Sequence, residues 1–187
     1  AVTACDAFLK EFPEHANAAE IAVRKAAVLG RNDKLAEAGA AYAVVAADYA
    51  KSPLAADASI LSGRFFYRAD KLDDSVKAFQ KTIDAAGKDA TEAAHWLCRI
   101  YLKQKQPAKA VDVASKQVAA AKDSPFLVNL KLDEADALLE VGKKKESLDA
   151  YAKVAKQHPE HELAPKALYD AAFTALELKD YEQGKTL

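Results

Sequence analysis

The 187-residue chain contains no methionine, one tryptophan, two cysteines and six residues each of glycine and proline. Two cysteines exclude a fold held together by several disulfides, and so little glycine and proline excludes a loop-rich or disordered chain. No run of apolar residues approaches the roughly 18 that a membrane-spanning helix requires. The net charge of −1 gives no overall attraction to nucleic acid or to an anionic membrane. What remains is a folded domain for which we expect no nucleic-acid partner and no insertion into a membrane, and local charged patches stay open.

What the sequence has in abundance is alanine, with 43 residues, and a fixed repeat. Alanine is the best helix former, and it allows helices to approach closely. Small residues recur at spacings of 37, 37, 35, 37 and 37, and a repeat of this length is typical of helical solenoids. Because solenoids bind partners along an extended surface, the repeat itself indicates a binding function. The small residues of this series are Ala1, Ala38, Ser75, Ala110, Ser147 and Gly184.

Each repeat contains two amphipathic helices joined by a short turn. In one repeat, Leu61 and Phe65 lie on the apolar face of the first helix, and Phe79 lies on that of the second. No segment alternates apolar and polar residues over enough positions to predict a strand. We therefore predict first helices near 16–30, 53–69, 90–104, 125–141 and 163–178, and second helices near 33–50, 72–86, 107–121 and 144–157.

The sequence predicts a single array over residues 1–187 that starts and stops within a repeat. Residues 1–12 match the rear half of a second helix, and residues 181–187 open another one, so we expect either a segment of a longer array or poorly ordered flanks. The core should contain five large residues in phase with the repeat, namely Tyr42, Leu61, Phe79, Leu138 and Tyr151. The repeats are expected at about 16–52, 53–89, 90–124, 125–161 and, in part, 162–187.

Small and aromatic residues hold fixed positions in both helices, as Gly63, Phe66, Ser75 and Phe79 illustrate. This pattern resembles the tetratricopeptide repeat, a helix–turn–helix unit, and five units in phase cover essentially the whole chain. The resemblance implies an all-α fold, a right-handed superhelical solenoid of antiparallel helix pairs, without enzymatic activity or a cofactor.

The linkers between repeats suggest where the protein acts. Longer linkers that contain a proline, such as residues 158–164, resemble those of bacterial outer-membrane assembly lipoproteins and periplasmic division-coordinating proteins. That resemblance implies a periplasmic or cell-envelope location. Two unpaired cysteines favour a reducing compartment instead, so a cytoplasmic location stays open.

In the tetratricopeptide family the first helices line the concave surface. Carried over to this chain, these positions are basic and partly aromatic in the middle repeats, and the last repeat adds two rings. Arginine and tyrosine are favoured binding anchors, and the arginine fork suits carboxylates. The alternative is an ordinary charged helix face with ion pairs between successive turns. The candidate partner-binding residues are Arg64, Tyr67, Arg68, His95, Arg99, Lys103, Tyr169 and Phe173.

Cysteines and histidines do not form a chemical site in the sequence. Cys5 and Cys98 fall at core positions about two and a half repeats apart, so we expect both thiols to be unpaired. Pro159 places His158 and His161 in a turn, and no second group of ligands stands at the spacing of a metal site. We predict no catalytic residue, no metal and no cofactor.

The sequence thus predicts a non-catalytic protein–protein interaction scaffold that holds a partner segment in its concave groove. A regulatory or targeting module is the alternative. It would belong to a larger enzyme or membrane-associated protein whose activity lies outside these 187 residues.

Overall fold

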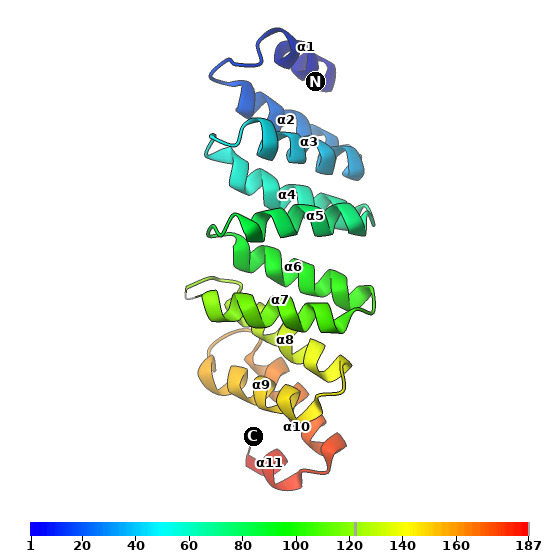
Figure 1. The fold of residues 1–187 in the computed structure, drawn as a ribbon, viewed down its shortest axis with the longest axis vertical. Helices are drawn as coiled ribbons and strands as arrows, with labels where there is room; N and C mark the ends of the chain where they lie inside the picture. The colour runs from blue at the N-terminus through cyan, green and yellow to red at the C-terminus, as the bar shows by residue number, and fades with distance from the viewer. Residues whose placement is uncertain (122, 187) are drawn as a thin grey trace. The chain divides into compact units, whose positions relative to one another are not determined.

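The computed structural model describes residues 1–121 and 123–186, and all eleven regular elements in these ranges are α-helices (Figure 1). The chain divides into two compact units, Ala1–Ala93 and the part from Ala94 onward. The first unit contains α1 (Val2–Glu11), α2 (Ala18–Arg31), α3 (Leu35–Asp48), α4 (Leu54–Arg68), α5 (Leu72–Asp84) and the start of α6 (Ala90–Lys103). The second contains the rest of α6, α7 (Pro107–Ala120), α8 (Leu127–Glu140), α9 (Lys144–Gln157), α10 (Ala164–Leu178) and α11 (Tyr181–Thr186).

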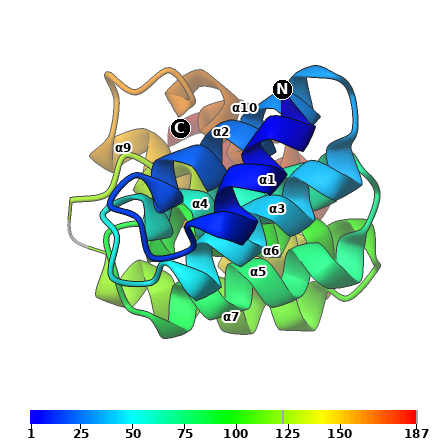
Figure 2. The same ribbon diagram turned by 90° about the horizontal axis from the view of Figure 1, so that it is seen from above.

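The predicted helix pairs are confirmed. Every end of the nine helices predicted by range lies within two residues of the prediction. Consecutive helices in each unit run antiparallel, and α1, α2 and α3 pack in order (Figure 1, Figure 2). Leu187, the last residue of the predicted final helix, lies outside the described residues. None of the described helices is long and apolar enough to cross a lipid bilayer.

The series of small residues marks the closest approach between the two helices of a repeat. Ala38, Ser75, Ala110 and Ser147 are all 0% exposed. The Ser75 hydroxyl donates a hydrogen bond of 2.8 Å to the carbonyl of Gly63 on the preceding helix. Ser147 makes the same bond, also 2.8 Å, to the carbonyl of Ala135. Serine therefore replaces alanine at this position without leaving a buried hydroxyl unpaired.

Four of the five large residues predicted for the core are buried, namely Tyr42, Phe79, Leu138 and Tyr151. Leu61 is partly buried and lies at the edge of the core. Leu61 packs at the edge of the cluster that contains Tyr42, and it also lines a surface cavity that leaves one of its sides open.

The turn inside each repeat has one fixed backbone conformation. Its left-handed residue ends the first helix, and the next amide closes the turn; for example, the Lys34 N–H donates to the Leu29 carbonyl at 3.0 Å. This arrangement satisfies carbonyls that the helix end leaves without partners. The left-handed residues of these five turns have φ between 55° and 83°, and they are Asp33, Asp70, Lys105, Gly142 and Lys179. Four of the five carry a side chain, so this turn does not require glycine.

Candidate functional site

Three of the predicted site residues lie together on α4 in the first unit. Arg64 is exposed, and its guanidinium lies 3.7 Å from the Glu92 carboxylate. The Arg68 guanidinium lies over the ring of Phe65, 5.3 Å from its centroid. Tyr67 is half-buried. Both arginines of α4 therefore reach the surface while they interact with other side chains of the same unit.

The surface around Arg64 carries more negative charge than the sequence suggested. Arg64 lines a cavity of about 270 Å³ together with three carboxylates, those of Asp57, Asp89 and Glu92. Lys88 lies 3.6 Å from Asp57 and offsets part of this charge. Sequence reasoning missed Asp89 because it precedes α6 and so belongs to no predicted helix face.

His95 is buried in the second unit and is not accessible to a partner. Its Nδ1 atom shares a hydrogen bond of 2.5 Å with Oδ2 of Asp133 on α8, and the ring of Phe126 lies 5.8 Å away. Burial raises the pKa of the Asp133 carboxyl, and the hydrogen bond from His95 opposes that rise. The pair joins α6 to α8, so His95 has a structural role.

The other candidates of the second unit lie on its surface. Arg99 and Lys103 are exposed on α6. Tyr169 and Phe173 on α10 are stacked, with ring centroids 6.4 Å apart and an interplanar angle of 17°. The two residues are 69% and 51% exposed, which is unusual for two neighbouring aromatic rings on one helix.

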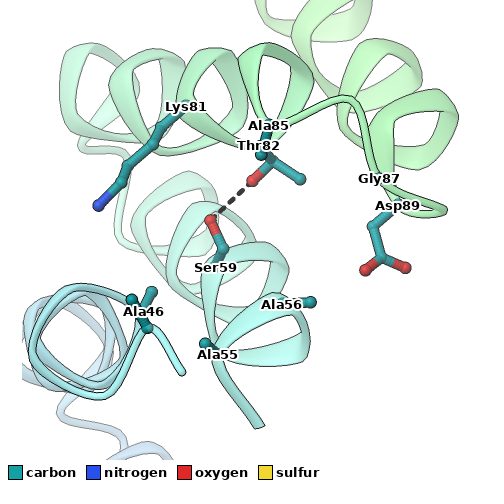
Figure 3. Close-up of a pocket in the computed structure, with 10 residues that line it drawn as sticks. Ala46, Ala55, Ala56, Ser59, Lys81, Thr82, Ala85, Gly87 and Asp89 are labelled. Carbon is teal, nitrogen blue, oxygen red and sulfur yellow. Dashed lines mark hydrogen bonds between the residues drawn. The ribbon is translucent and has the colours of Figure 1, made fainter. Parts of the chain in front are cut away.

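Two further cavities lie between successive second helices. The first, of about 320 Å³, lies among α3, α4 and α5, and five alanines line it. Figure 3 shows the hydrogen bond of 2.7 Å between the hydroxyls of Ser59 and Thr82 at its wall. The second, of about 260 Å³, lies among α7, α8 and α9, and places Lys131 and Val154 where the first has Ser59 and Thr82. Equivalent positions of two repeats thus line a cavity twice, with mostly small side chains in the first and larger ones in the second.

The second cavity brings two ammonium groups close together. Burial lowers the pKa of Lys131, and the neighbouring charge of Lys153 lowers it further. Lys131 Nζ also lies 3.0 Å from Nε2 of His158, whose pKa is lowered by burial and by Lys131. The carboxylates of Glu134 and Asp149 line the same cavity and balance the two lysines. No three potential metal ligands come together among the residues that the structure describes.

Both cysteines are free, and they differ in exposure. Cys98 is fully buried, its Sγ lies 3.5 Å from the carbonyl oxygen of Ala110, and burial raises the pKa of its thiol far above the usual range. Cys5 is half-buried on α1. Because the thiolate is the nucleophile, the structure favours a structural role for Cys98.

We expect only one thiol of the native protein to react readily with a colour-forming disulfide reagent at neutral pH. Cys5 should react first, and Cys98 should react at the rate of unfolding, because its thiol is both covered and protonated. Cys5→Ser should remove the fast phase and Cys98→Ser the slow one. Two fast phases in the native protein would contradict this assignment.

Comparison with known proteins defines the fold. No protein-family model and no curated protein matches the sequence. The structure of YrrB, a TPR protein with an unusual peptide-binding site, is 21% identical at a TM-score of 0.65, over 96% of this chain and 88% of YrrB. A Podosopora anserina protein with nearly identical TPR-like repeats is 14% identical at a TM-score of 0.69, over 92% of this chain and 93% of that one. The apo form of RapI is 10% identical at a TM-score of 0.77, over 99% of this chain and 56% of RapI.

These likenesses agree with the paired helices and with the repeat of 37 or 35 residues. Because the sequence identities are low, these comparisons show the fold of this chain and not its partners or its activity. This chain has the fold of the tetratricopeptide-repeat proteins.

Proposed function

We propose that this chain is a non-catalytic scaffold that binds a segment of a protein partner on the faces of its first helices. The observation that carries this proposal is the exposed, stacked pair of Tyr169 and Phe173, next to Leu176, which is 60% exposed. Large apolar side chains exposed together mark interaction surfaces, and tyrosine is enriched among binding hot spots. The likeness to YrrB, a TPR protein with a peptide-binding site, supports it.

Exposed cations on first helices supply polar contacts in each unit: Arg64 and Arg68 in the first, and Arg99 and Lys103 in the second. Arginine binds carboxylates with two parallel hydrogen bonds. In the ion pair between Arg64 and Glu92, the Arg64 side chain is 50% exposed and the Glu92 side chain 17%. A partner carboxylate can therefore approach the exposed part of the Arg64 side chain while Glu92 keeps its contact. His95 has no part in this surface, since it is buried against Asp133.

Neutralising the exposed arginines tests the proposal. With a partner identified by affinity capture and mass spectrometry, Arg64→Ala, Arg68→Ala and Arg99→Ala should weaken binding, raise the off-rate and flatten its dependence on salt, with helicity unchanged. Each arginine should contribute about 2–5 kcal/mol if its charge pair is fully desolvated, and below about 1 kcal/mol at the rim. Titration calorimetry at two salt concentrations measures the affinity and its salt dependence.

A matched control removes the same charge from another surface. Lys143, Lys144 and Lys145 lie in the turn between α8 and α9 and at the start of α9, and each pairs with a carboxylate of its own unit. The double variant Lys143→Ala with Lys145→Ala should bind as the parent does, and Lys144 is kept because it pairs with Glu177 on α10. If that variant loses the partner while the arginine variants retain it, the binding surface lies on the turns.

A further inference from the structure

The cavity among α7, α8 and α9 has an aliphatic wall. Its volume is about 260 Å³, and the wall consists of Val118 from α7, Leu138 from α8, and Ala150 and Val154 from α9. Lys131, which also lines the cavity, precedes Leu138 by seven residues on α8. The cavity therefore extends along about two helical turns, or roughly 10 Å. It has the size and the lining for a short aliphatic chain.

Two lysines of this cavity lie close to each other without a carboxylate between them. Burial lowers the pKa of Lys131 on α8, and the charge of Lys153 on α9 lowers it further, so the two ammonium groups repel each other. The Lys131 Nζ atom lies 3.0 Å from Nε2 of His158 and 3.5 Å from Oε1 of Gln157. An ammonium group has three N–H donors, so at least one stays open to a ligand. In the part of the chain that the structure describes, no carboxylate forms an ion pair with either lysine.

The two carboxylates of the cavity are held by other side chains. The Ser115 hydroxyl donates a hydrogen bond of 2.6 Å to Glu134. The side-chain amide of Gln183 donates one of 3.1 Å to Asp149, and the Lys145 ammonium lies 3.8 Å from the same carboxylate. Glu134 and Asp149 therefore balance the charge of the cavity overall, but they leave the repulsion between its two lysines in place.

The combination of two ammonium groups and an aliphatic wall selects a particular kind of anion. An anion that contacts both ammonium groups would replace their repulsion with two attractions. Lysine is a point charge that accepts many anions, so the selection comes from the wall. A fully hydrated anion would leave the wall without a contact, whereas an aliphatic chain would remove the wall and itself from water.

We propose that this cavity binds an aliphatic carboxylate, with the carboxylate on Lys131 and Lys153 and the chain along Val118, Leu138 and Val154. The cavity shares no residue with the proposed partner surface, so this inference goes beyond the scaffold function and does not rest on it. A free monocarboxylic acid and the C-terminal aliphatic residue of a protein present the same chemistry to the site.

Titration of the isotope-labelled chain with acetate, butanoate and hexanoate, followed by NMR, is the direct test. Hexanoate should shift the amide signals of α8 and α9 around the cavity in a saturable manner. Each added methylene should tighten binding by up to about fourfold, because it moves from water to the aliphatic wall. Lys131→Met with Lys153→Met should weaken the binding of hexanoate by about tenfold or more, since both charged hydrogen bonds are lost.

Two control variants make the test specific. Lys116→Met with Lys156→Met removes two exposed ammonium groups of α7 and α9 that lie outside the cavity, and should leave the affinity unchanged. Ala150→Leu keeps both lysines of the cavity and fills its wall. This variant should bind acetate as the parent does, and hexanoate no more tightly than acetate. The NMR spectrum of each variant shows whether it is folded.

A pentapeptide that ends in leucine distinguishes the two sources of the carboxylate. Tighter binding of this peptide than of hexanoate would assign the site to a protein C-terminus, and weaker binding would assign it to a free acid. The same peptide with an amidated C-terminus should not bind in either case, because it lacks the charge.

Three results would overturn the inference. Hexylamine that binds as tightly as hexanoate would show that Glu134 and Asp149 dominate the cavity. Inorganic phosphate that binds as tightly as hexanoate would show that charge alone is recognised. Full binding of hexanoate by the variant that lacks Lys131 and Lys153 would place the ligand elsewhere. Each result leaves the scaffold function untouched, because the arginine variants and a captured partner test that function separately.

Discussion

Phe79→Ala should lower the free energy of unfolding by about 3–5 kcal/mol, the cost of removing a core phenylalanine. The ring is 0% exposed. It lies directly on the backbone of α4, since a Cβ added at Gly63 would come within 2.5 Å of it. The alanine variant would leave a cavity at the contact between the two helices of a repeat. Urea denaturation, followed by circular dichroism, measures the change.

Phe12→Ala is the matched control for that measurement, because Phe12 is 46% exposed at the end of α1. Its effect should stay within about 0.5 kcal/mol, as for most surface substitutions. If Phe79→Ala lowers the free energy of unfolding by less than about 1 kcal/mol, the packing of the Phe79 ring on Gly63 does not belong to the stabilising core.

His95→Leu should destabilise the protein by about 3–5 kcal/mol at neutral pH, because it leaves the buried Asp133 carboxylate without its partner. Replacing both residues by leucine should recover most of this loss, since no buried charge then remains. Denaturant titrations of the two single variants and the double variant give the coupling energy between the two side chains.

The loss in His95→Leu should also depend on pH. Burial raises the pKa of Asp133, and the variant lacks the hydrogen bond that opposes this rise. A carboxyl whose pKa is raised in the folded state stabilises the fold most when it is protonated, and this contribution is lost as the pH increases. The variant should therefore regain stability relative to the parent as the pH falls towards about 4. A penalty that does not change with pH would contradict the assignment of an unpaired Asp133.

The fold could be predicted from the sequence because two periodicities determine it. The 3.6-residue period of apolar side chains located each helix, and the longer repeat gave the positions where two helices touch. Buried residues such as Ala38 and Ser75 belong to both patterns, so the two signals confirmed each other.

The candidate site was harder to predict because exposure depends on the facing helix. His95 lies on the same face as the exposed Arg99, and only the arrival of Asp133 from α8 makes it a buried pair. Asp133 follows His95 by 38 residues, one more than the spacing of 37 between most repeats. This near match to the repeat was the sequence feature that could have indicated the pair. Tyr169 illustrates the converse: it has the same repeat position as the buried Leu132 but no first helix opposite it in the described residues.

The packing of each helix against its neighbours in sequence also determines how the chain folds. In both units the most extensive packing joins consecutive helices, such as α3 with α4 and α9 with α10. Few long loops must close before a contact forms, so the contact order is low, and chains of this kind fold within microseconds to milliseconds. Folding can begin at any helix pair and spread to the next one, without a single obligatory nucleus.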